Sequence, residues 1–255
     1  MYSVGQITFV CFMVFVAGFI DSIAGGGGLI SIPAYTLTGM PMHSVMGCNK
    51  FSSACGTSFS VARFMANKAL DIKIAIISAI GAMIGSGLAV KIVLGLSDEF
   101  LRIMMVIVLP IIAIAIILKK DVGQADGEIA DGIKAICISI LIGLSVGFYD
   151  GFIGPGTGTI AIFLFSAFMN YNLKTASGNT KILNLSSNVS ALISFMISGT
   201  VIYHIAIPAA ICNIAGNYIG SGIAVKKGSK FIRPVMITVV VLLLGKTFID
   251  FFSTF

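Results

Sequence analysis

The longest stretch without a charged residue is 182–225, 44 residues with no Asp, Glu, Lys or Arg. A second such stretch, 22–49, has 28 residues. Because a transmembrane helix needs about 20 predominantly apolar residues, the first stretch is long enough for two crossings. Over the whole chain 57% of the residues are hydrophobic and 10% are charged, far from the balance of a soluble domain. The sequence therefore predicts an integral membrane protein.

The N-terminal apolar segment, residues 1–21, resembles a secretory signal peptide in its length. It lacks the basic first region and the small-residue cleavage site of such peptides. We therefore expect it to remain as the first helix.

The net charge of +6 fits basic loops on the cytoplasmic side of a membrane, and no nucleic acid is expected as a partner.

The cysteines give no sign of a metal or redox site. The five of them include no CxxC pair and lie among apolar residues. Neither a metal site nor a disulfide framework is predicted from them, and no cofactor is expected.

Four short motifs of the first half recur in the same order in the second half. The offsets between the copies are 129, 131, 135 and 131 residues. The motif pairs are "GFIDSIAGGGG" with "GFYDGFIGPGT", "CNK" with "GNTK", "IGSGLAVK" with "IGSGIAVK", and "FLR" with "FIR". Such order predicts a duplicated unit: a first repeat, 1–118, and a second repeat, 132–255, joined by a polar linker, 119–131.

Each predicted repeat contains five hydrophobic stretches. They cover about 6–24, 28–40, 44–66, 72–94 and 100–118 in the first repeat, and 132–152, 156–169, 176–198, 201–225 and 231–252 in the second. The second stretch of each repeat follows glycine and is short for a full span. We expect an all-α polytopic membrane protein with 8 to 10 transmembrane helices, broken at the glycine-rich motifs.

The distribution of Lys and Arg tests the topology. If every stretch crosses, two basic residues, Lys91 and Arg102, fall on one side and eleven on the other, a strong positive-inside bias. If the short stretches only re-enter, the division is roughly even. The eleven are Arg63, Lys68, Lys73, Lys119, Lys120, Lys134, Lys174, Lys226, Lys227, Lys230 and Arg233. Five crossings per repeat are favoured, which makes the repeats an inverted pair with both termini outside, an arrangement typical of secondary transporters.

The glycine-rich breaks are the first candidate binding elements. Irregular backbone at membrane depth survives only where protein or a water-filled cavity covers it. The helix that follows such a break offers unpaired N–H groups and a positive dipole end, which favour an anion. A simple kink or close helix packing is the alternative role. The residues assigned to substrate binding on this ground are Gly25, Gly26, Gly27 and Gly28 in the first break, and Gly156 and Thr157 in the second.

Two lysines lie at matching positions near the starts of helical stretches rich in small polar residues. Lys50 and Lys181 are candidates to balance the charge of an anion, because an ionisable residue within a membrane is a functional candidate by default; snorkelling to the headgroups is the alternative. Asn49, Asn179 and Asn184 are candidate hydrogen-bond donors to it. The polar stripes comprise Asn49, Ser52, Ser53, Gly56, Ser60 and Arg63 in the first repeat, and Lys181, Asn184, Ser187 and Asn188 in the second.

Two aspartates, Asp21 and Asp150, immediately precede the breaks. Each has three candidate roles: to neutralise a lysine, to carry a proton coupled to transport, or to cap the new helix. The sequence leaves these roles open.

Small residues recur at every fourth position in "GAMIGSGLA" (81–89) and "GNYIGSGIA" (216–224). This spacing lets two membrane helices approach closely. The contacts could lie within one chain or between two, so a homodimer is left open.

The motifs together resemble a known family. "GFIDSIAGGGGLISIPAY" (18–35), "GCNKFSS" (47–53), "GFYDGFIGPGTGT" (147–159) and "SGNTKILNLSSNVSAL" (177–192) are similar to the sulfite exporter TauE/SafE family, also called the toluene sulfonate uptake permease family. The resemblance covers nearly the whole chain. It implies a multi-pass transporter of the cytoplasmic membrane that moves sulfite, sulfoacetate or related organosulfonates. The two breaks differ in sequence, which leaves open whether they contribute equally.

The leading hypothesis is a secondary transporter in the lipid bilayer whose small anionic substrate binds near the midplane at the repeat interface. An anion channel, or a transporter of another small organic anion, is the alternative. A membrane enzyme that holds a phosphate on the glycine loop fits poorly, because a dinucleotide fingerprint needs a βαβ unit and no Ser/His/Asp or metal constellation is present. The chain is therefore not expected to be an enzyme.

Overall fold

The computed structural model describes residues 2–97, 99–101, 103–104 and 129–254, and within them it is built from helices without strands. The predicted all-α class is confirmed. The helices are α1 (Val4–Ala24), α2 (Gly28–Thr36), α3 (Met42–Ala66), α4 (Ile72–Val93), α6 (Gly132–Phe152), α7 (Thr157–Met169), α8 (Leu173–Ile197), α9 (Tyr203–Lys227) and α10 (Ser229–Thr254). The fifth predicted stretch, 100–118, and the linker, 119–131, lie largely outside the described residues.

Side-chain caps and glycines set several helix boundaries. Ser3 and Gln6 form a capping box at the start of α1, and the carboxylate of Asp71 accepts from the backbone N–H of Ile74 at the start of α4. At the other end of α1, Gly25 adopts a left-handed φ of 77°, and Gly156 precedes α7 with a φ of 81°. Only glycine takes this backbone region freely, so both breaks depend on it.

The two short helices follow these breaks. α2 has 9 residues and α7 has 13, which at 1.5 Å per residue gives lengths of about 14 and 20 Å. Neither length reaches across a hydrocarbon core of about 30 Å. By length, the short helices therefore do not make the full crossings that the count of lysines and arginines favoured.

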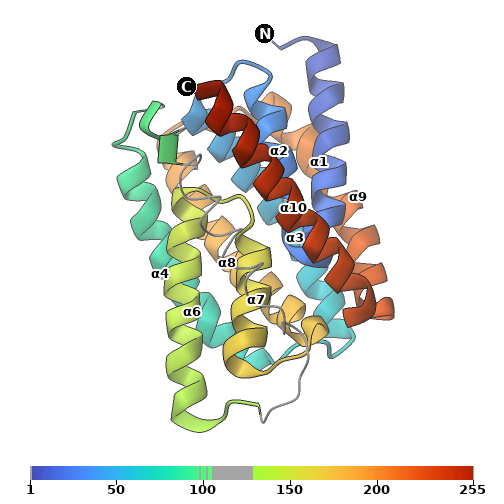
Figure 1. Ribbon diagram of the computed structural model, residues 1–255. Helices are drawn as coiled ribbons and strands as arrows, with labels where there is room; N and C mark the ends of the chain where they lie inside the picture. The colour runs from blue at the N-terminus through green and yellow to red at the C-terminus, as the bar shows by residue number, and fades with distance from the viewer. Residues whose placement is uncertain (1, 98, 102, 105–128, 255) are drawn as a thin grey trace.

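The long helices pack in pairs that join the two predicted repeats. α1 lies along α9, and α6 lies along α4; α3 and α8 contact each other at the centre (Figure 1). In each outer pair, the first helix of one predicted repeat packs on the fourth helix of the other. The buried residues form one continuous hydrophobic cluster, so the halves share a core.

The helix directions agree with the expected inversion. Both termini lie at the same end of the molecule, α1 runs away from that end, and α6 runs toward it (Figure 1). The inverted duplication, its boundaries and the side of the membrane that the termini face stay predictions.

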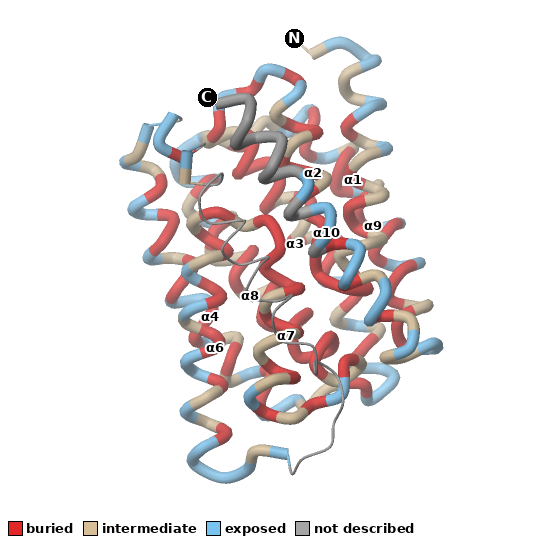
Figure 2. Tube along the Cα trace, viewed as in Figure 1, coloured by how far each residue is buried: buried red, intermediate tan, exposed pale blue. Residues whose placement is uncertain are grey.

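The outer surface of the bundle suits lipid. Large apolar side chains such as Ile76, Ile80 and Met83 of α4 are exposed, while the buried residues line the inside of the bundle (Figure 2). Among the described helices α1, α4 and α6 are long and apolar enough to cross a membrane by length and composition. The structure thus supports a membrane protein.

The small-residue motifs lie where helices approach closely within one chain. A Cβ atom at Gly216 of α9 would stand 2.2 Å from the carbonyl oxygen of Phe15 in α1, and one at Gly81 of α4 would stand 2.9 Å from that of Ile140 in α6. Because real Cβ atoms essentially never come under 3.0 Å of another heavy atom, these positions require glycine. A homodimer remains untested.

Replacement of Gly216 by alanine should destabilise the protein. Overpacking a tight contact costs roughly 1–3 kcal/mol, which outweighs the gain in helix propensity. Gly245→Ala in α10 is the matched control, because no heavy atom lies within 4 Å of a Cβ there. Thermal unfolding in detergent should show a lower midpoint for G216A alone; equal midpoints would contradict the packing described for α1 and α9.

Reporter fusions test the membrane orientation. With both termini outside the cytoplasm, a C-terminal alkaline phosphatase fusion should be active in bacterial cells, and a C-terminal green fluorescent protein fusion should be dark. A fluorescent fusion combined with an inactive phosphatase would reverse the orientation predicted from the lysines and arginines.

Candidate functional site

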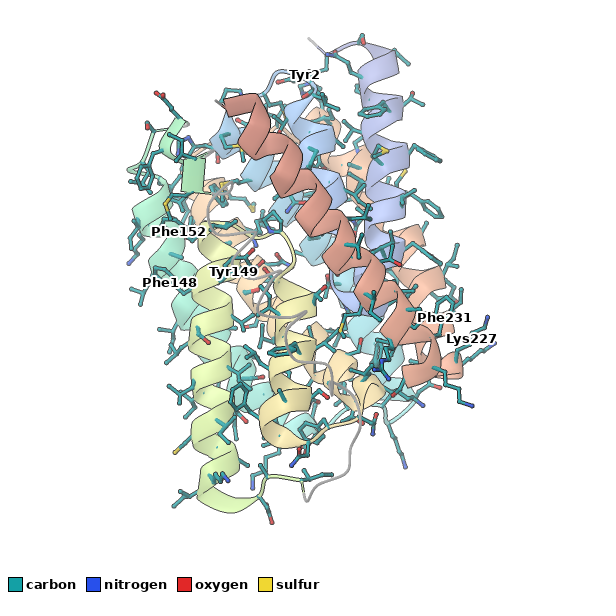
Figure 3. The ribbon with its side chains drawn as sticks, viewed as in Figure 1. Tyr2, Phe148, Tyr149, Phe152, Lys227 and Phe231 are labelled. Atoms are coloured by element: carbon teal, nitrogen blue, oxygen red, sulfur yellow. The ribbon has the colours of Figure 1, made fainter. Side chains whose placement is uncertain are left out.

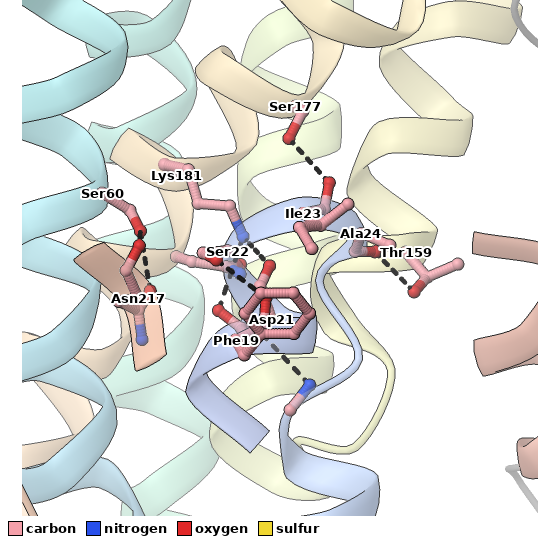
Figure 4. A network of polar contacts seen from close by, with 12 residues as sticks. Phe19, Asp21, Ser22, Ile23, Ala24, Ser60, Thr159, Ser177, Lys181 and Asn217 are labelled. Carbon is pink, nitrogen blue, oxygen red and sulfur yellow. Dashed lines mark hydrogen bonds and ion pairs between the residues drawn. The ribbon is translucent and has the colours of Figure 1, made fainter. Parts of the chain in front are cut away.

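The two glycine-rich breaks meet inside the bundle. A Cβ at Gly25 would lie 2.3 Å from the Cα of Gly158, and the converse distance is 2.4 Å. The backbone N–H of Thr159 donates to the carbonyl of Gly25 at 3.1 Å, and the Thr159 hydroxyl donates to that of Ala24 at 2.8 Å (Figure 4). Any side chain at Gly25 or Gly158 would therefore separate the breaks.

Each lysine predicted from the sequence pairs with an aspartate of the other predicted repeat. The Nζ atom of Lys50 in α3 lies 2.7 Å from Oδ2 of Asp150 in α6. The Nζ atom of Lys181 in α8 lies 3.4 Å from Oδ2 of Asp21 in α1. The lysine side chains are 3% and 0% exposed, so neither snorkels to a surface of the bundle. The partner of Asp21 is Lys181 and not Lys50.

Hydroxyl groups complete the surroundings of Asp150. Thr157, in the first turn of α7, donates to Oδ1 at 2.9 Å, and Ser187 of α8 donates to Oδ2 at 2.6 Å. Lys50 also donates to the side-chain oxygen of Asn188 at 3.1 Å. The Lys50–Asp150 pair thus links α3, α6, α7 and α8.

Asp21 accepts hydrogen bonds from groups that can only donate. Lys181 donates to both the carboxylate and the main-chain carbonyl of Asp21, and the backbone N–H of Gly27 donates to Oδ1 at 3.3 Å (Figure 4). Asp21 therefore neutralises a lysine and also binds the backbone just before α2. The ion pair with Lys181 is thus observed, whereas proton coupling at Asp21 stays a prediction.

The loop that precedes α7 is held by Tyr149 of α6. Its hydroxyl donates to the carbonyl of Pro155 at 2.5 Å, and the side chain lies beside the second break (Figure 3). This contact positions the N-terminus of α7 beside Asp150.

A small polar cavity of about 20 Å³ lies where these elements meet. A buried water needs roughly 10–15 Å³, so the cavity has room for about one water and not for an oxyanion of sulfur. Its lining comes from both repeats: Asp21, Gly25, Gly28, Asn49, Lys50, Ser53, Asp150, Gly154, Thr157, Gly158, Asn184 and Asn188. We refer to this small form of the candidate site, which is too narrow for such an anion, as the closed form.

Eight of the thirteen residues predicted from the sequence line this cavity. They are Asp21, Gly25, Gly28, Asn49, Lys50, Asp150, Thr157 and Asn184. Gly156 lies at the start of α7 as its N-cap, and Gly26 and Gly27 pack against Val239 and Asp21.

Two further predicted residues point elsewhere. The side-chain oxygen of Asn179 accepts the backbone N–H of Asp71 at 2.8 Å, so it binds the start of α4. Lys181 is held by Asp21 beside the cavity and does not line it. The structure thus gives the two matching lysines different surroundings.

The cavity asparagines differ in how far their polar atoms are satisfied. The Oδ1 atom of Asn49 accepts from Ser31 of α2 at 2.6 Å. The Oδ1 atom of Asn184, whose residue is 5% exposed, has no hydrogen-bond partner in the described part of the chain. A buried oxygen without a donor costs free energy, so this atom is available to a proton donor that enters the cavity.

The lining also includes Ser53 and Asn188, and Ser187 binds Asp150. The polar stripes of α3 and α8 contain all three, but no individual role follows from the stripes. The helical spacing of Asn188, one turn beyond Asn184, is the sequence signal that could have placed it in the site.

No group of three or more metal-binding side chains occurs among the residues that the structure describes.

The paired charges limit what the closed site can do. Lys50 with Asp150 and Lys181 with Asp21 give a net charge of zero, and an isolated extra charge in a low-dielectric interior is costly. An anion can bind only if a lysine is released from its aspartate or if the site gains a positive charge.

Comparison with known proteins gives consistent results. Residues 10–247 match the family described as Sulfite exporter TauE/SafE. A "Probable membrane transporter protein ORF9" from Sinorhizobium sp is 34% identical over 88% of this chain and 85% of its own length. The "Probable membrane transporter protein YfcA" of Escherichia coli K12 is 31% identical over 94% and 88%. A "Probable membrane transporter protein" from Haemophilus influenzae is 28% identical over 92% of each chain. No solved structure matches.

A double-mutant cycle tests the pairing of Asp21. Removal of one partner of a buried ion pair typically costs about 3–5 kcal/mol, so Asp21→Asn and Lys181→Gln should each lower the stability in detergent. The double variant should lose less than the sum, with a coupling of at least ~1 kcal/mol. Asp21→Asn with Lys50→Gln is the control cycle, and a coupling there as large as with Lys181 would contradict the observed pairs.

Proposed function

This chain belongs to the sulfite exporter TauE/SafE family, and on that premise we propose that it is a secondary transporter of small sulfur-containing anions across the cytoplasmic membrane. The substrates are sulfite, sulfoacetate or other organosulfonates. The named relatives are probable membrane transporters rather than enzymes, which supports transport as the general activity.

The observation that carries the proposal is the buried polar cavity at the meeting of the two breaks. It is lined by a lysine, asparagines and the first residues of two helices. Helix N-termini and lysine are the groups that bind sulfonate and sulfite oxygens. In the proposed open form, Lys50 balances the charge of the anion, while Asn49 and the N–H groups at Gly28 and Gly158 donate to its oxygens.

The closed cavity favours a carrier over a channel. A channel needs a continuous pore, whereas this site has room for about one water where the two breaks pack tightly against each other. In the proposed cycle the helices of the two repeats shift against each other, so that the cavity opens to one side of the membrane at a time. An anion channel and a carrier of another small organic anion remain the competing functions.

Flux measurements test this function. Protein reconstituted in liposomes should take up labelled sulfite, sulfoacetate or a monosulfonate with saturation and counterflow, and acetate should compete weakly. High-rate electrical currents without counterflow would indicate a channel, and no flux across the anion panel would refute the proposal.

Lys50→Ala tests the site. A charge-assisted hydrogen bond contributes about 1.5–3 kcal/mol, so the variant should lower the ratio of maximal flux to half-saturation concentration by about 10- to 100-fold. Lys91→Ala, at an exposed position in the last turn of α4, is the matched control and should transport normally. Unchanged flux in the Lys50→Ala, Lys181→Ala double variant would refute the site.

A further inference from the structure

We infer that Asp150 binds a proton as a co-substrate, so that each anion enters the site together with one proton. This inference rests on the proposed anion transport at the same cavity. The protonated carboxyl of Asp150 releases Lys50, and the ammonium group of Lys50 then binds the anion.

The charge balance of the cavity requires such a compensation. Lys50 and Asp150 are almost fully buried and directly paired. A monoanion placed beside this intact pair gives the buried site a net charge of −1, and one proton on Asp150 restores a net charge of zero. Burial of an uncompensated charge is costly, so protonation of Asp150 makes binding of the anion strongly more favourable.

The hydroxyl neighbours of Asp150 can serve both of its protonation states. Thr157 lies 2.6 Å from the carbonyl oxygen of Gly154, and Ser187 lies 3.1 Å from that of Asn184. Each hydroxyl can therefore turn its hydrogen to a carbonyl and use its oxygen to accept the proton of a neutral Asp150. The carboxyl thus keeps a hydrogen-bond partner after it is protonated.

Asp21 lacks this property. Its partners, the ammonium group of Lys181 and the backbone N–H of Gly27, are donors only. A proton on Asp21 would have no acceptor among these partners and would weaken the hold on α2. The geometry assigns the proton to Asp150 and a structural role to Asp21.

Few charged or titratable groups face Asp150. α3 contributes Lys50, and α1 contributes Asp21 at the cavity, whose charge Lys181 of α8 balances. Neutral polar groups come from the other elements: Thr157 of α7, and Asn184, Ser187 and Asn188 of α8. Ser86 of α4 donates to the carbonyl of Ser187, and Tyr149 donates to that of Pro155. No histidine lines the cavity as described, so Asp150 is the group placed to take the proton.

The cycle balances in protons and charge. From one side, Asp150 accepts a proton from water and the anion replaces its carboxylate at Lys50. On the other side, the anion leaves, Asp150 gives its proton to water, and the ion pair forms again. Transport of a monoanion is then electroneutral, and an imposed gradient of one pH unit sustains a tenfold anion gradient.

The test uses methanesulfonate or isethionate, which stay monoanions between pH 5 and 8 and cannot carry the proton themselves. In proteoliposomes with the outside one pH unit more acidic, the wild type should accumulate the label about tenfold and acidify the lumen by one proton per anion. Flux without proton movement would overturn the inference and leave the proposed transport intact. No flux would refute both.

Asp150→Asn should abolish accumulation, and its residual counterflow should no longer vary with pH. Lys91→Ala is the control, because this exposed lysine lies outside the cavity: its tenfold accumulation should persist. Tenfold accumulation by Asp150→Asn would overturn the inference.

Two further measurements apply if Asp150→Asn does not fold. Calorimetry of methanesulfonate binding to wild-type protein in two buffers of different ionisation enthalpy should show uptake of one proton per anion. Ser187→Ala removes a hydroxyl partner of Asp150, so the midpoint of the pH profile of flux should move. Binding without proton uptake, or an unmoved midpoint, would contradict the role of Asp150.

Discussion

The arrangement of the bundle depends on two lysines that cannot stay charged in a membrane without partners. Lys50 and Lys181 are buried among helices, and each pairs with an aspartate from the other half of the chain. Because an unpaired buried charge is far more costly than a lost hydrogen bond, these pairs fix how the two halves meet. The contact of the breaks at Gly25 and Gly158 follows from the same arrangement.

Asp21 and Asp150 lie in similar sequence motifs but have different hydrogen-bond partners. With the offset of 129 residues that aligns Asp21 with Asp150, Gly28 corresponds to Thr157. Thr157 supplies a hydroxyl to Asp150, whereas Asp21 receives a backbone N–H from Gly27. The hydroxyl partners of Asp150 can therefore reverse their hydrogen bonds, whereas the partners of Asp21 are donors only. This small sequence difference is the basis on which we propose a proton site at Asp150 and a structural role for Asp21.

Much of the fold could be predicted from sequence, because long apolar runs and glycine breaks act locally. The expected stretch 72–94 corresponds to α4, Ile72–Val93, and 132–152 corresponds to α6, Gly132–Phe152. The interaction partners of the site residues could not be predicted in the same way. Helical spacing places Asn179 and Lys181 on a polar helix but says nothing of the helix opposite, and in the structure Asn179 binds the start of α4 and Lys181 binds Asp21. The pairing of Lys50 with Asp150 likewise depends on packing between repeats.

In the proposed loaded state, the substrate takes the place of Asp150 beside Lys50. An experimental structure in lipid nanodiscs with a bound monosulfonate measures this through the separation of the Lys50 Nζ and Asp150 Oδ2 atoms, which is 2.7 Å in the closed form. We expect a sulfonate oxygen within hydrogen-bond distance of Nζ and a separation of Nζ from Oδ2 that is too long for an ion pair. A sulfonate bound elsewhere, with the Lys50–Asp150 pair intact, would contradict it.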